Sequence, residues 1–160
     1  MHYYAIHNVG TFLGTSWAMY MERQLWLSQV IAAAPEIYRT KLRLVRGSRL
    51  IKDVILDNGA YEDCLVPDDL LLGHVMEYMP HTIVLPDMPD GDGQASEDRA
   101  YNFVKMLTER KLFARQGIAR LIYVPQGRDK ADTMASFERL LKNPRHWCWT
   151  LPTAISFVIG

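Results

Sequence analysis

Three short apolar runs in this chain each end at polar residues that could contact a ligand. The runs are residues 54–56, 83–85 and 121–124, and each is followed within two residues by a side chain with hydrogen-bonding groups: Asp57, Asp87 or Gln126. Their apolar residues are consecutive rather than alternating, which is typical of strands buried on both faces in a parallel sheet. The same pattern three times predicts three neighbouring strands with polar ends.

The rest of the hydrophobic pattern predicts alternating strands and helices. Strands are expected at residues 3–6, 52–56, 82–85, 120–124 and 153–159. Helices are expected at residues 15–34, 67–78, 96–112 and 129–141. Residues 36–50 are mixed and basic, and we expect an irregular connection there with room for a short strand at 42–45.

Capping and helix-breaking residues mark the expected helix ends. Pro35 follows the first helix, and Pro67 begins the second with two aspartates in the first turn, where carboxylates suit the helix dipole. Ser96 and Asp129 are expected to cap the third and fourth helices.

Helical spacing also predicts which side chains face the core. The expected positions are Trp17, Met21, Leu25 and Ser28 in the first helix, Ala100, Phe103, Val104 and Leu107 in the third, and Met134, Phe137, Leu140 and Leu141 in the fourth.

This alternation predicts one α/β domain over residues 1–160 with a parallel sheet covered by helices. An open doubly wound sheet and part of a (β/α)8, or TIM-type, barrel both fit the order. A whole barrel typically takes about 250 residues, so we expect this chain to form a partial barrel.

Composition excludes several classes of protein. Lys plus Arg and Asp plus Glu number 18 each, so no basic excess favours non-specific coating of nucleic acid. The basic stretch at residues 39–52 is interpreted as a solvated face, with a phosphate-contacting edge as the sharper alternative.

Two cysteines without a CxxC motif predict reduced thiols and no zinc site built from this chain. With no apolar run long enough for a membrane span and no signal peptide, we expect a cytoplasmic protein that does not contact membranes.

Parallel strands bring their carboxyl ends to one edge of the sheet, where ligands bind. Asp57, Asp87 and Gln126 are therefore expected around one pocket, with Gly160 after the last strand. Each motif alone could be a simple turn, but three in a row favour a site. A carboxylate can accept N–H groups from a guanine-type edge, and a glutamine amide can donate to an exocyclic oxygen.

These motifs resemble those of a known enzyme family. Residues 56–62, Leu-Asp-Asn-Gly-Ala-Tyr-Glu, resemble the Asp-Ser-Gly-Gly-Phe/Tyr-Gln segment of tRNA-guanine transglycosylases, and look closer still to the DNA 7-deazaguanine transglycosylases of phages and bacterial genomic islands. Residues 85–87, Leu-Pro-Asp, are similar to that family's strand ending on a base-contacting aspartate. Residues 124–127, Val-Pro-Gln-Gly, resemble its Val-Gln-Gly strand end. The similarity covers residues 51–160 in the family's order.

The resemblance implies exchange of guanine for a 7-deazaguanine in DNA or tRNA. It implies that Asp57 is the acid/base and that Asp87 contacts the base edge. It also implies that Gln126 contacts the exocyclic oxygen. The remaining substrate-binding positions that it implies are glycines or wall residues: Asn58, Gly59, Gly127 and Gly160.

The chain departs from the family in ways that limit this interpretation. Asn58-Gly59-Ala60 replaces Ser-Gly-Gly and Glu62 replaces Gln. The family's nucleophilic aspartate and its zinc site, made of cysteines and a histidine, would lie beyond Gly160. No cofactor is therefore expected from the residues present. Asp90, Asp92 or Glu62 could stand in as nucleophile, but acidic loops are more often solvated.

Two other classes of function stay open. One is a non-catalytic purine- or nucleotide-binding protein, or one subunit of a split enzyme. The other is a structural protein that reuses the fold. His7, His74 and His81 are interpreted as structural, and His146 shows no metal-ligand spacing. The open edges of a partial barrel predict pairing with a second copy or a partner chain.

Overall fold

A computed structural model describes residues 5–6, 24–27, 53–59, 66–88, 91–142 and 154–157. Within them the chain forms one parallel sheet, and the strand order β1-β2-β3-β4-β5-β6 follows the sequence. The strands are β1 Ala5–Ile6, β2 Gln24–Leu27, β3 Asp53–Leu56, β4 Thr82–Val84, β5 Arg120–Tyr123 and β6 Ala154–Phe157. The parallel α/β class predicted from the sequence is confirmed.

The order of the strands contains no reversal. Every neighbouring pair is parallel, with Leu56 beside Ile83 and Val84 beside Ile122 in register. Doubly wound sheets reverse their strand order at the point where ligands bind. That point is missing among these six strands, so ligand-binding groups must be sought along the whole carboxyl edge.

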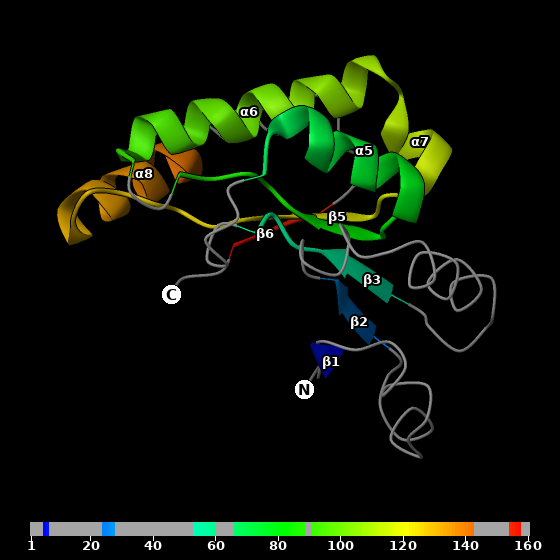
Figure 1. Ribbon diagram of the computed structural model, residues 1–160. Coiled ribbons are helices and arrows are strands. Elements are labelled where there is room, and N and C mark those ends of the chain that lie inside the picture. Colours follow the sequence, from blue (N-terminus) through cyan, green and yellow to red (C-terminus); the bar gives the residue numbers. More distant parts are fainter. Residues whose placement is uncertain are drawn as a thin grey trace.

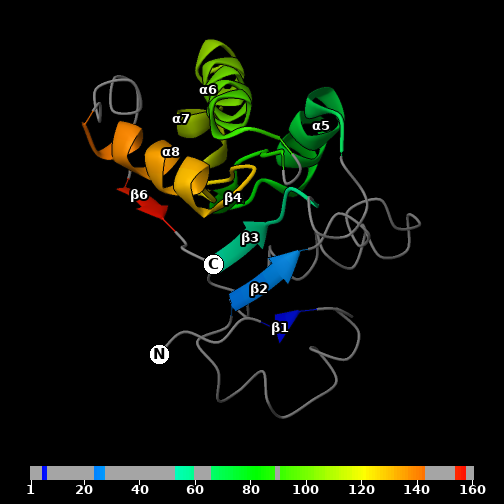
Figure 2. The ribbon, with the colours of Figure 1, turned by 90° about the vertical axis from the view of Figure 1, so that its left-hand side faces the viewer.

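Four described helices lie together on one side of the sheet (Figures 1 and 2). They are α5 Asp68–Tyr78, α6 Gly93–Glu109, α7 Leu112–Gln116 and α8 Lys130–Lys142. Alternate strand residues face this helical layer and join one hydrophobic cluster with it, among them Leu56, Ile83 and Leu121, each 0% exposed. The α6 stripe predicted from its spacing is confirmed, because its four residues are all buried.

The opposite face of the sheet is also buried at the centre. Ile55 and Val84 alternate with the helix-facing residues, yet they are only 1% and 4% exposed. Burial on both faces explains why these strands carry consecutive apolar residues instead of an alternating pattern.

The helix predicted over residues 15–34 is wrong, because β2 lies inside it at Gln24–Leu27. Trp17, Met21 and Leu25 happen to share helical spacing, whereas Leu25, Trp26 and Leu27 are consecutive apolar residues that suit a short buried strand. Backbone pairing with β1 and β3 on either side decides between the two. The strand considered at residues 42–45 lies outside the described residues.

Two details of the helices also differ from expectation. Asp92, not Ser96, caps α6, since its Oδ1 accepts from the Ala95 N–H at 2.7 Å. Ser96 is buried in the first turn and accepts from the Met88 N–H at 3.1 Å. In α8, Met134 and Leu141 are expected inside but are 46% and 56% exposed. The helix instead buries Ser136, because a hydrogen-bonded contact with β5 replaces the apolar one.

Candidate functional site

Three polar side chains from three adjacent strand ends meet at the carboxyl edge of the sheet. Asn58 follows β3, Asp87 follows β4 and Gln126 follows β5. The Asn58 amide donates to Asp87 Oδ1 at 2.9 Å, and the Gln126 amide donates to Asp87 Oδ2 at 2.7 Å. We call these three residues the strand-end cluster. Asp87 and Gln126 meet as the strand order predicts, and the residue after β3 that bonds to Asp87 is Asn58, where the sequence pointed to Asp57.

The strand-end cluster is buried. Asp87 is 1% exposed, Asn58 7% and Gln126 8%. Burial raises the pKa of the Asp87 carboxyl above its ordinary value of 3.8, and the hydrogen bonds from Gln126 and Asn58 work in the opposite direction. Each oxygen therefore has a neutral amide partner, and the positive charge of Arg99 acts on the carboxylate from outside the cluster.

Backbone contacts fix the position of this carboxylate. The Asn58 amide also donates to the Leu85 carbonyl at 2.7 Å, and the Leu85 N–H donates to the Ile122 carbonyl at 2.8 Å. Hydrogen bonds thus continue past the ends of β3, β4 and β5. The segment that carries Asp87 is held on both sides.

Arg99 on α6 holds the same segment from the helical layer. Its guanidinium donates to the Asp87 carbonyl at 2.8 Å, to the Val66 carbonyl at 2.8 Å and to Asp68 at 2.7 Å. The sequence did not single out Arg99, because one arginine on an amphipathic helix carries no spacing signal. Its role becomes visible only when α5 and α6 lie beside the end of β4.

Asp57, the predicted acid/base, lies next to the strand-end cluster and is half-buried. Its Oδ1 accepts from the Gly59 N–H at 3.1 Å, which closes a local turn, and Gly59 has a φ of 75° that favours glycine. Asn58 and Gly59 are both buried in this turn. Gly160 lies outside the described residues.

Gly127 has a packing role. A Cβ at this position would lie 2.3 Å from the Thr133 nitrogen and 2.7 Å from the Asp132 carbonyl carbon, both backbone atoms of α8. The end of β5 can therefore approach the first turns of α8 only because residue 127 has no side chain. This close approach fixes the backbone immediately after Gln126.

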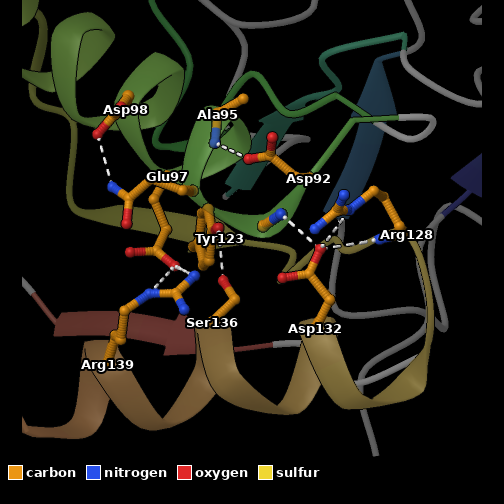
Figure 3. A network of polar contacts seen from close by, with 11 residues as sticks. Asp92, Ala95, Glu97, Asp98, Tyr123, Arg128, Asp132, Ser136 and Arg139 are labelled. Carbon is orange, nitrogen blue, oxygen red and sulfur yellow. Dashed lines mark hydrogen bonds and ion pairs between the residues drawn. The ribbon is translucent and has the colours of Figure 1, made fainter.

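A second polar network joins α6 to α8 (Figure 3). Asp132 accepts from the backbone N–H groups of Gly93 and Arg128, each at 3.1 Å, and Arg139 pairs with Glu97 at 2.6 Å. We call these five residues the α6–α8 network. Backbone hydrogen bonds, with Arg128 nearby, lower the pKa of Asp132.

Tyr123, at the end of β5, lies between the Glu97–Arg139 pair and Asp132 (Figure 3). It is 0% exposed, and its hydroxyl lies 3.4 Å from the Ser136 hydroxyl. Burial raises the pKa of the Tyr123 hydroxyl. The tyrosine therefore stays neutral and supports α8 rather than facing a ligand.

The other candidate residues have structural roles where they are described. Asp92 caps α6, which removes it as a stand-in nucleophile; Glu62 and Asp90 lie outside the described residues. His74 is buried against the Tyr78 ring, with centroids 5.9 Å apart. His81 Nδ1 accepts from the Val54 N–H at 3.3 Å, at the opposite end of the strands.

Within the described ranges, no group of three or more His, Cys, Asp or Glu side chains could hold a metal ion. No helix in those ranges is long and apolar enough to cross a membrane. Searches against protein-family models, curated proteins and solved structures found no match to this chain. What the site can do chemically must therefore be argued from its own geometry.

Proposed function

We propose that the strand-end cluster recognises a guanine-type base. The observation that carries this proposal is the Asp87 carboxylate, held by amides from two other strand ends and by Arg99 through its backbone. A carboxylate can accept about four hydrogen bonds, so two amide donors leave acceptor capacity on it. A guanine edge, with its ring N–H beside an amino group, supplies two donors with matching spacing.

The neighbouring groups suit the rest of such a base. The Gln126 carboxamide lies against Asp87 and belongs to the class of group that hydrogen-bonds an exocyclic oxygen. Asp87 is only 1% exposed, so the proposal requires the atoms that cover it to move aside when a ligand enters. A buried carboxylate gains more from two donors than an exposed one, since water competes less for it.

The activity proposed for this site is base exchange on DNA or tRNA, as the resemblance to guanine transglycosylases implies. The glycosidic bond to guanine would break, and a 7-deazaguanine would form the new bond at the same sugar carbon. Asp57 would remove or return the proton on the base nitrogen. The carboxylate that attacks the sugar is not among the described residues, so the proposal assigns no residue to that step.

A partial (β/α)8 barrel is part of the same proposal. Six parallel strands in sequential order, helices on one side, and buried apolar residues on the opposite face all support it. In such a barrel the strand-end cluster would line the catalytic face. Pairing with a second copy or a partner chain would complete the wall.

Base recognition is tested by calorimetric titration of the chain with guanine, 7-deazaguanine and adenine. We expect guanine and 7-deazaguanine to bind, and adenine to bind at least about tenfold more weakly. That difference in affinity corresponds to the loss of one or two hydrogen bonds. Asp87→Ala should abolish binding. Asp98→Ala is the matched control, because Asp98 is exposed on α6 and accepts from the side-chain amide of Gln94, one turn earlier on the same helix.

Exchange is tested separately by nucleoside mass spectrometry of DNA and tRNA from cells that express the chain with a 7-deazaguanine supplied. Asp57→Asn should retain base binding and lose any exchange. Guanine binding without exchange would support the second candidate, a non-catalytic purine-binding protein. The observation that favours that candidate is the burial of Asp87 between the Asn58 and Gln126 amides, because these three side chains offer hydrogen-bonding groups for recognition of a base. A folded chain that binds neither guanine nor 7-deazaguanine would overturn both candidate functions.

A further inference from the structure

Asn58 uses both N–H groups of its side-chain amide within the protein. Its Nδ2 carries two hydrogens, and it donates to the Leu85 carbonyl at 2.7 Å and to Asp87 Oδ1 at 2.9 Å. Because the Leu85 carbonyl can only accept, the amide cannot be turned around without placing two oxygens together. Asn58 therefore presents a fixed N–H to Asp87 and none to a ligand.

The two amide contacts determine which protonation state of Asp87 fits the site. Asn58 donates to one carboxyl oxygen and Gln126 to the other. A proton on either oxygen would point toward, or have to avoid, an N–H that is already there. Burial favours the neutral acid, while the two amides and the nearby charge of Arg99 favour the ionised, acceptor-only carboxylate.

The ionised and neutral forms select different ligands. An acceptor-only carboxylate pairs with two adjacent donors, such as the ring N–H and amino group of guanine. It repels an edge in which an acceptor lies beside a donor, as in adenine. A neutral carboxylic acid has one donor and one acceptor, so it suits the adenine-type edge instead.

We infer that Asn58 is a positioning residue that holds Asp87 as an acceptor-only carboxylate and so sets the preference of the site for donor–donor base edges. This inference rests on the proposed function, since it names what determines the selectivity of that site. Asn58 acts through Asp87 and does not touch the base.

The test compares Asn58→Asp and Asn58→Ser with the wild-type chain. Asn58→Asp preserves shape but replaces the donor with a second carboxylate, so the two acids must share a proton. We expect the guanine-to-adenine affinity ratio at pH 7 to fall by about tenfold or more, the effect of one hydrogen bond to a charged group. Asn58→Ser keeps one hydroxyl donor and should show a smaller fall. Asn102→Asp, an exposed substitution on α6, should leave the ratio unchanged.

A second measurement keeps the inference independent of base binding. The carboxyl ¹³C resonance of Asp87 should titrate at higher pH in Asn58→Asp than in wild type, and Asn58→Ser should remain folded by circular dichroism and lie between them. An unchanged titration midpoint in both variants would overturn the inference. An unchanged midpoint combined with tight guanine binding would overturn it while leaving the proposed function standing. If the wild-type chain bound no guanine but the midpoint still shifted in the Asn58 variants, the proposed function and the selectivity would be overturned, and only the positioning of Asp87 would stand.

Discussion

Asp87, after β4, and Asp132, in α8, show how different neighbours give the same type of side chain different roles. Asp87 is almost fully buried, accepts from two side-chain amides and has a raised pKa. Asp132 is partly exposed, accepts from two backbone N–H groups and has a lowered pKa. Backbone donors near the helix ends stabilise the charge of Asp132, whereas burial opposes the charge of Asp87.

The difference separates a structural carboxylate from a candidate functional one. Asp132 satisfies backbone groups at the starts of α6 and α8, which would otherwise lack partners. The Asp87 carboxyl accepts from two side-chain amides, and although burial raises its pKa most strongly, the nearby charge of Arg99 acts in the opposite direction. A buried carboxylate with a raised pKa is the kind of group that binding and catalytic sites use.

The largest effect is expected at Gly127, whose close contact with α8 joins the strand-end cluster to the α6–α8 network. Gly127→Ala places a Cβ against backbone atoms of α8 that lie 2.3 and 2.7 Å away, so α8 must move. We expect a loss of about 3 kcal/mol in the free energy of unfolding, the upper range for overpacking. The shift should also displace Gln126 and weaken guanine binding, as measured by urea denaturation and calorimetry.

Gly73→Ala is the matched control for that substitution. Gly73 lies within α5, and an added Cβ would meet nothing within 4 Å. This variant should be more stable than wild type by about 0.5–1 kcal/mol, because alanine is the better helix former. If both variants lost the same stability, the close contact between β5 and α8 would not exist in solution.

The sequence predicted the strand ends well because burial leaves a strong signal there. Consecutive apolar residues followed by Asp57, Asp87 or Gln126 gave the positions of β3, β4 and β5 to within a residue or two. The meeting of Asp87 and Gln126 followed from the rule that parallel strands end together. That Asn58 would be a link to Asp87 could not be predicted, because a turn-forming asparagine looks the same with or without that contact.

The remaining differences arose where tertiary contacts decide between local options. β2 has only four residues, too few for a periodic signal, and its pairing with β1 and β3 outweighs the helical spacing around it. Met134 and Leu141 suggested an apolar inner face for α8, yet Ser136 faces Tyr123 instead. The partners of Arg99 come from α5 and from the end of β4, both distant along the chain.

The opposite pKa shifts predict opposite pH dependences. Folding raises the pKa of Asp87, so its contribution to stability is present below 3.8 and is lost as pH rises through the raised value. Folding lowers the pKa of Asp132, so its contribution is present above 3.8 and is lost as pH falls through the lowered value. Urea denaturation between pH 2 and 8 should show both.

Substitutions test which of the two aspartates produces each part of this pH dependence. Asp87→Asn should flatten the free energy of unfolding above pH 3.8, and Asp132→Asn should flatten it below. Asp98→Asn, on the exposed face of α6, serves as the control for a lost surface carboxylate. Loss of pH dependence in the same range for both aspartates would contradict the comparison between them.

The smallest effect is expected at the N-cap of α8. A substitution there tests whether losing the cap, without moving α8, changes the strand-end cluster. Asp129 Oδ1 accepts from the Asp132 N–H at 2.9 Å, as the capping position predicted from the sequence requires. Asp129→Ala should cost about 1 kcal/mol in the free energy of unfolding, the usual value for a lost N-cap. Asp129→Ser, which keeps a capping oxygen, should restore most of it. Guanine affinity should stay unchanged in both variants, because Gln126 is held by Asp87 and by the packing at Gly127 rather than by the cap. A parallel fall in stability and affinity in Asp129→Ala would show instead that the fraying of α8 reaches the strand-end cluster.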